Sequence, residues 1–126
     1  MTVHEIPSGP GMPKTIGPYS HVVRGGDFLF VSGQPGLNVE TGEVAGPGFE
    51  PQARQAFENV ARVLRAAGSD MSRVVKVTVY LADPNAFAKL NELFAEFFPA
   101  KPPARATPIV ALPRGLLISI ECIALA

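Results

Sequence analysis

Two charged residues near the C-terminus are the strongest candidates for chemistry in this sequence. Arg105 follows a proline-bounded loop and opens an apolar run, and Glu121 lies in a strand-like segment that is otherwise almost free of charge. An unpaired charge is costly to bury, so each side chain needs a partner. Either the two charges neutralise each other, or they face a small anionic ligand.

The spacing of Arg105 and Glu121 leaves both alternatives open. If the last two strands form a hairpin around Pro113, the two residues lie opposite each other in an ion pair that contributes about 0.2–1 kcal/mol. If another strand lies between them, their backbones are about 9–10 Å apart, and a small molecule or water fits between the charges. Spacing alone favours the ion pair.

In the functional alternative each residue has a role. An arginine holds a carboxylate through two parallel hydrogen bonds that also fix its orientation. Glu121 can position and deprotonate a water molecule, a type of help that typically accelerates a reaction by about 10²–10⁴-fold. Tyr19 and Ser32 offer neutral hydroxyls. Asn91 interrupts the apolar stripe of a predicted helix, where a buried amide bonded to backbone is the simpler interpretation and a role in the site is the alternative.

The elements that position these residues predict an α+β fold with a mixed six-stranded sheet and two helices on one face. Residues 27–32 are almost continuously apolar, which predicts a central strand covered on both faces. The predicted helices begin at Pro51 and at Asp83-Pro84, and end at Gly68 and Pro99. A long loop, 35–50, contains a turn at Thr41-Gly42. The predicted strands are 2–8, 21–24, 27–32, 73–81, 105–111 and 116–125.

Composition excludes several classes of function. The 126 residues fit a single domain, 1–126, and Lys plus Arg equal Asp plus Glu at 11 each, so no net charge attracts nucleic acid or an anionic membrane. The basic residues are also scattered. No stretch approaches about 18 apolar residues, so we expect a soluble protein, with the cytoplasm as the default location. The single cysteine, Cys122, excludes an internal disulfide and a cysteine-based zinc site, and His4 and His21 lack metal-site spacing.

Several segments together resemble the RidA/YjgF reactive-intermediate deaminase family, over almost the whole chain. Asn91, Leu112-Pro113 and Ile120-Glu121 fall in register with the same pattern. The segments that carry the resemblance are Ile16-Gly17-Pro18-Tyr19-Ser20, Phe30-Val31-Ser32-Gly33-Gln34, Gln52-Ala53-Arg54-Gln55-Ala56, Lys76-Val77-Thr78-Val79-Tyr80-Leu81-Ala82-Asp83 and Pro103-Ala104-Arg105.

The resemblance implies a chorismate-mutase-like fold assembled as a homotrimer, with sites in clefts between subunits. It implies hydrolysis of 2-imino acids such as 2-iminopropanoate and 2-iminobutanoate, or their enamine tautomers, to 2-oxo acids and ammonia, without a cofactor. A non-catalytic member that binds a small carboxylate in the same cleft is the alternative.

The resemblance also assigns residues. Arg105 matches the arginine that holds the substrate carboxylate, and Glu121 matches the acid proposed to orient or activate water. Tyr19 and Ser32 match hydroxyl residues that line the cleft, and Asn91 matches a helix amide near it. Thr107 stands where many members of the family have cysteine, and the resemblance places it among the substrate-binding residues with Arg105, Tyr19, Ser32 and Asn91.

Overall fold

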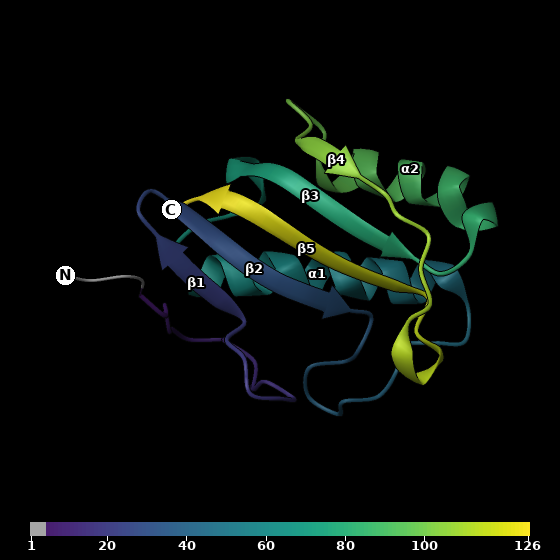
Figure 1. The fold of residues 1–126 in the computed structure, drawn as a ribbon, viewed down its shortest axis with the longest axis horizontal. Coiled ribbons are helices and arrows are strands. Elements are labelled where there is room, and N and C mark those ends of the chain that lie inside the picture. Colours follow the sequence, from purple (N-terminus) through teal and green to yellow (C-terminus); the bar gives the residue numbers. More distant parts are fainter. Residues whose placement is uncertain (1–4) are drawn as a thin grey trace.

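The computed structural model describes residues 5–126, which form one sheet with two helices behind it (Figure 1). The sheet order is β1-β2-β5-β3-β4, in which β3 and β4 are parallel and the other neighbours antiparallel. The strands are β1 (Val22–Gly25), β2 (Phe28–Pro35), β3 (Val74–Leu81), β4 (Ala104–Ala106) and β5 (Ile118–Leu125). The helices are α1 (Phe49–Ala66) and α2 (Phe87–Phe97), with 3₁₀ turns at Met71–Arg73, Pro84–Ala86 and Pro113–Gly115.

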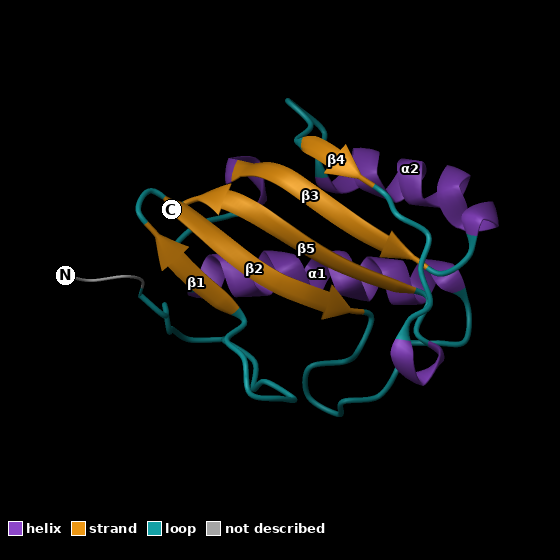
Figure 2. Ribbon diagram, viewed as in Figure 1, coloured by secondary structure: helices purple, strands orange, loops and turns teal. Residues whose placement is uncertain are grey.

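The core lies between the sheet and the helices, which cover one face as the sequence predicts (Figure 2). Alternate residues of β5, among them Ile118 and Ile120, point into this core and are fully buried. Along α1, Phe57, Val60 and Leu64 recur at helical spacing and meet them. Neither helix within residues 5–126 is long and apolar enough to cross a membrane.

The opposite face of the sheet, called here the open face, has no covering layer within the described chain. Phe28 and Phe30 of β2 are 41% and 46% exposed there, and Leu125 of β5 is 37% exposed. The prediction that β2 is covered on both faces is therefore wrong for one chain, although its central place, between β1 and β5, is confirmed. The apolar residues that prompted the prediction form the uncovered surface.

The sheet has five strands over the described residues, and not six. Of the predicted strand 2–8, Glu5 forms an isolated bridge with Arg24, and residues 1–4, which include His4, lie outside the described residues. The predicted strand 105–111 is shortened to β4, because Pro108 has no N–H to donate to a ladder. Its pairing with β3 resumes only at an isolated bridge between Leu81 and Ile109.

The loop between β2 and α1 is held down by two buried amides of α1. The Gln52 side chain donates to the Gly46 carbonyl and accepts from Leu117 N–H, both at 3.0 Å. The Asn59 amide donates to the carbonyls of Pro35 and Leu37, at 3.0 and 2.9 Å. These bonds fix the end of β2 against the helix, and the expected turn at Gly42 has the positive φ (73°) that favours glycine.

Candidate active site

A β-bulge places Ser32 and Gly33 beside Glu121. Val31 pairs with Cys122 and Gln34 pairs with Ile120, so two residues of β2 stand opposite one residue of β5. Such a bulge bends the strand and redirects its side chains. The Ser32 hydroxyl donates to the Ser20 carbonyl at 2.7 Å, which leaves its oxygen lone pairs available. The register therefore brings a hydroxyl, a half-buried glycine and a carboxylate to one place on the open face.

Glu121 is held by Tyr80, a residue that the sequence did not assign to the site. The Tyr80 hydroxyl donates to Glu121 Oε1 at 2.7 Å. The other carboxylate oxygen, Oε2, has no hydrogen-bond partner among residues 5–126. Every buried side-chain nitrogen or oxygen in this part of the chain has a partner, so Oε2 is not buried and is accessible. Glu121 lines a groove on the open face together with Lys76 and Thr78 of β3. We call Ser32, Gly33, Tyr80 and Glu121 the bulge cluster.

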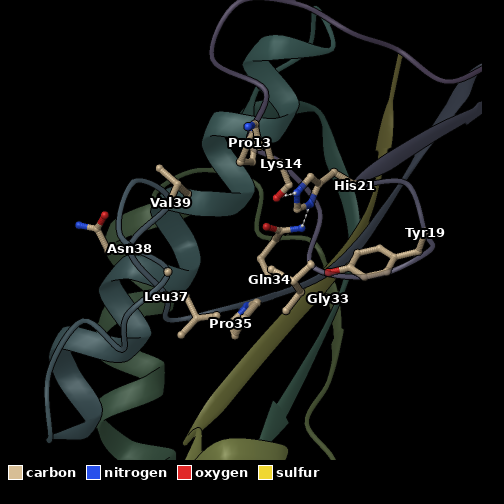
Figure 3. A pocket seen from close by; sticks show the side chains of 12 residues that line it. Pro13, Lys14, Tyr19, His21, Gly33, Gln34, Pro35, Leu37, Asn38 and Val39 are labelled. Carbon is tan, nitrogen blue, oxygen red and sulfur yellow. Dashed lines mark hydrogen bonds between the residues drawn. The ribbon is translucent and has the colours of Figure 1, made fainter.

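The loop that carries Tyr19 is tied to the end of β2 by His21 and Gln34 (Figure 3). The Lys14 carbonyl can only accept, so His21 Nε2, 3.0 Å away, carries the proton, and Nδ1 accepts from Gln34 Nε2 at 3.1 Å. The same Gln34 nitrogen donates to the Ser32 carbonyl at 3.0 Å. Tyr19 lies edge-to-face against His21 and lines one hollow with Gly33. Tyr19 is thus positioned next to the bulge cluster.

Arg105 lies at the other edge of the sheet and points to the opposite face. It pairs with Val77, which is buried against the helices, and paired residues on neighbouring strands point the same way. Its guanidinium lies over the rings of Phe94 and Phe87 of α2, at 4.8 and 5.3 Å from the ring centroids. No carboxylate forms a salt bridge with Arg105 within the described chain. We call Arg105, Phe87 and Phe94 the arginine cluster.

Asn91 and Thr107 lie beside the arginine cluster. Asn91 follows Phe87 by one helical turn on α2 and shares its stripe with Phe94. It is exposed, so the interpretation of Asn91 as a buried amide is wrong. Thr107 is half-buried directly after β4. Both residues therefore lie on the same side of the molecule as Arg105 and away from Glu121.

β3 lies between the strands of Arg105 and Glu121, which rules out the predicted hairpin and its ion pair. The alternative, a ligand held between the two charges of one chain, also fails, because the side chains point to opposite faces. One chain thus carries two half-sites. The bulge cluster offers a carboxylate and hydroxyls, and the arginine cluster offers a cation on an aromatic support.

The residues that sequence reasoning missed are Tyr80, His21, Gln34 and the two phenylalanines under Arg105. Tyr80 has the same parity as Lys76 and Thr78 along its strand, which already indicated the open face. Its bond to Glu121 depends on the strand order, which single-sequence periodicity does not give. The helical spacing of Phe87 and Phe94 predicted a core stripe, and only the crossing of β4 over α2 places them under Arg105.

Cys122 and the acidic residues offer no metal or thiol chemistry in the part of the chain that the structure describes. No group of three or more His, Cys, Asp or Glu side chains converges among residues 5–126. Cys122 points into the core, where burial, and to a smaller extent the nearby Glu121 carboxylate, raises the pKa of its thiol to about 12. A thiol with that pKa is a poor nucleophile at neutral pH.

Comparison with known proteins identifies relatives across almost the full chain. The family described as endoribonuclease L-PSP matches residues 10–126. A RutC family protein of Pyrococcus horikoshii is 48% identical over 113 residues, which cover 89% of this chain and 90% of that protein. The 2-iminobutanoate/2-iminopropanoate deaminase of Mus musculus is 41% identical over 123 residues, 97% of this chain and 91% of that protein.

Two solved structures show the same fold. The crystal structure of RidA from Psychrobacter sp. PAMC 21119 superimposes with a TM-score of 0.90 at 39% identity, over 97% of this chain and 99% of that one. Escherichia coli TdcF with bound serine superimposes with a TM-score of 0.89 at 36% identity, over 97% and 98% of the two chains.

Proposed function

The chain belongs to the RidA/YjgF family, and we propose that it hydrolyses reactive 2-imino acids, or their enamine tautomers, to 2-oxo acids and ammonia. The mouse and human relatives, each 41% identical to this chain, are named 2-iminobutanoate/2-iminopropanoate deaminases. The substrates we propose are 2-iminopropanoate and 2-iminobutanoate.

The observation that carries the proposal is the state of Arg105. Arg105 is half-buried, and its guanidinium lies over two aromatic rings. It has no hydrogen-bond partner among residues 5–126. Its nitrogens are nevertheless not buried, so they are free to donate to a ligand. A supported cation with accessible donors fits a substrate carboxylate, which it binds through two parallel hydrogen bonds. Asn91 and the backbone at Thr107 lie next to this anchor and are proposed to line the same cleft.

We propose that the bulge cluster facing this anchor belongs to a neighbouring copy of the chain, in a homotrimer with sites between subunits. The two half-sites lie on opposite faces of the sheet, so one chain does not place Glu121 near a carboxylate bound to Arg105. The exposed apolar side chains of Phe28, Phe30 and Leu125 on the open face give such an assembly a surface to bury.

The chemistry requires orientation and a proton relay. Water, positioned and deprotonated by Glu121, adds to the electrophilic imine carbon to give a tetrahedral aminoalcohol. The proton held by Glu121 passes to nitrogen, the hydroxyl gives its own proton to Glu121 as the C–N bond breaks, and ammonia leaves as the 2-oxo acid forms. Tyr19 and Ser32 are proposed to hydrogen-bond the nitrogen and the developing hydroxyl. No cofactor takes part in this scheme.

Carboxylate binding without turnover is the second candidate, and it is motivated by the crystal structure of TdcF, which holds a bound serine. The two candidates share the arginine anchor and differ at Glu121. Thermal stabilisation by 2-oxobutanoate together with no imine hydrolysis would favour binding alone.

The test generates the imine in situ with an amino-acid oxidase and measures its loss against buffer. We expect the wild-type protein to accelerate hydrolysis and Arg105→Ala to abolish the acceleration. Arg105→Lys should lose most of it, because an ammonium lacks the planar fork. Arg62→Ala, on the exposed face of α1, is the matched control and should keep full activity. Normal activity in Arg105→Ala would rule out the proposed anchor.

A further inference from the structure

Tyr80 and Glu121 form a polar pair whose geometry is set by two neighbouring strands. Thr78 of β3 pairs with Glu121 of β5, and Tyr80 pairs with Ser119, so Tyr80 and Glu121 are diagonal neighbours on the open face. Diagonal neighbours in a sheet are within reach of long and aromatic side chains. The 2.7 Å bond from the tyrosine hydroxyl to Glu121 Oε1 spans this diagonal.

We infer that Tyr80 is a positioning residue for imine hydrolysis, which holds Glu121 by Oε1 so that Oε2 is directed to the water it activates. The inference rests on the proposed function and adds a residue to it. Glutamate has several rotatable bonds and loses its catalytic geometry easily, whereas a tyrosine ring on a strand has two. A hydrogen bond to a carboxylate is also stronger than one between neutral groups.

The pair divides the carboxylate between two tasks. Oε1 is occupied by the tyrosine hydroxyl and Oε2 is accessible, and Glu121 lines the groove together with Lys76 and Thr78. The Glu121 carboxylate, with a smaller contribution from burial, raises the pKa of the Tyr80 phenol, so the hydroxyl stays protonated and remains a donor at neutral and mildly alkaline pH. Lys76, the nearby cation in the groove, makes no salt bridge with Glu121 in the described chain.

A purely structural role for Tyr80 predicts a different outcome. If the ring only fills space on the open face, phenylalanine replaces it without loss, because Tyr80→Phe removes one oxygen and keeps the ring. A positioning role requires the oxygen itself. Ser119→Ala is the matched control, because Ser119 is the strand partner of Tyr80 on the same face and has no hydrogen bond to Glu121.

The experiment measures kcat and KM for 2-iminobutanoate hydrolysis in wild type, Tyr80→Phe and Ser119→Ala, with the oligomeric state checked by light scattering. A second measurement follows the carboxyl ¹³C signal of Glu121 in glutamate-labelled protein, assigned by its absence in Glu121→Gln. We expect Tyr80→Phe to lower kcat by about 10- to 100-fold, with KM changed less than about twofold. The Glu121 signal should move in Tyr80→Phe and stay in place in Ser119→Ala.

The outcomes separate the inference from the proposed function. Full kcat in Tyr80→Phe, with an active wild type, overturns the role of Tyr80 and leaves the proposed function standing. An unmoved Glu121 signal with a lowered kcat also overturns it, because the loss then does not act through that carboxylate. Absence of hydrolysis by wild type overturns the proposed function, and the positioning role of Tyr80 with it. A lower kcat together with a moved signal supports the inference.

Discussion

Arg105 and Glu121 lie on opposite faces of the same sheet, separated by β3. Arg105 shares its face with Val77 and contacts the rings of α2, whereas Glu121 shares its face with Thr78 and Tyr80. The cation that fits a carboxylate and the base that fits a water molecule therefore cannot meet one small substrate within a chain. We propose that a second copy of the chain supplies one of them.

Mixing two inactive variants should restore activity if the site is shared between chains. Arg105→Ala keeps an intact bulge cluster, and Glu121→Gln keeps an intact arginine cluster. In randomly mixed trimers, about one interface in four combines the two intact halves, so we expect up to about a quarter of wild-type activity after co-refolding. Each variant alone should show almost none.

The double variant provides the control for this complementation. A chain with both Arg105→Ala and Glu121→Gln contributes neither an intact arginine cluster nor an intact bulge cluster. When it is mixed with wild type, the activity of the mixture should only fall as the fraction of the double variant rises. If the single variants mix into stable oligomers and yet recover nothing, both residues act within one chain, and the shared site is wrong.

Much of the fold follows from local patterns in the sequence. The apolar stripe of α1 and the alternation from Val77 to Leu81 each specify an element by themselves. The glycine pair Gly25-Gly26 predicts the hairpin between β1 and β2, although the turn falls one residue later, at Gly26-Asp27, because Gly25 pairs with Phe28. Small deviations have local causes. Asp83 caps a 3₁₀ turn before α2 begins at Phe87. A bulge between Val74 and Lys76 interrupts the alternation of β3 and leaves the apolar side chain of Val75 exposed.

The candidate site could be predicted only as a set of residues. Which of them meet depends on the order of strands and on the faces they share, and both are long-range properties. The apolar run of β2 illustrates the limit. Its pattern indicates cover on both faces, but within one chain only the helix face is covered, since Phe28 and Phe30 are exposed. A periodicity does not state whether the covering layer comes from the same chain.

The aromatic support of Arg105 should contribute to substrate binding. Phe87 is 44% exposed, so Phe87→Leu removes a ring from the guanidinium with little loss from the core. A cation–π contact at an exposed site contributes about 0.5–1 kcal/mol, which corresponds to a rise in KM of about two- to fivefold with kcat unchanged. Steady-state kinetics with 2-iminobutanoate measure it.

Phe97→Leu is the matched control for this prediction. Phe97 belongs to the same helix but stacks on Phe57, with 4.7 Å between ring centroids, and does not lie against Arg105. Its loss should lower stability and leave KM unchanged. Equal KM values for Phe87→Leu and wild type would show that the ring does not hold the guanidinium in its binding position.

Gly36 should be intolerant of any side chain. A Cβ there would overlap the Gln52 carbonyl and come within 2.7 Å of Gln52 Cα, and both are backbone atoms that cannot move aside. Gly36→Ala should therefore cost about 1–3 kcal/mol of unfolding free energy, as overpacking typically does. For a chain of this size, the Tm falls by about 3–6 °C per kcal/mol, measurable by calorimetry.

Gly48→Ala tests whether the effect is specific to that close approach. A Cβ at Gly48 meets only Pro51 Cδ, at 3.9 Å, so the change should stay within about 0.5 kcal/mol, the scale of a weaker helix cap. A Gly36→Ala protein as stable as Gly48→Ala would mean that the loop shifts to make room and is not fixed by Gln52 and Asn59.

Cys122 should be inert in the folded protein, and its reactivity reports on the core. With a pKa of about 12, only about one thiol in 10⁴ is ionised at pH 8, whereas an unfolded cysteine has a pKa near 8.5 and ionises readily. A disulfide reagent should react slowly in buffer at pH 8 and rapidly at the same pH in guanidinium chloride. Cys122 is the single cysteine, so the signal has one source.

The same thiol chemistry separates Cys122 from the proposed reaction. Cys122 points away from the open face into the core. Imine hydrolysis should therefore survive treatment with iodoacetamide in the native state, and Cys122→Ala should keep the wild-type kcat. Inactivation by iodoacetamide that Cys122→Ala prevents would place the thiol within reach of the site and contradict its burial against the helices.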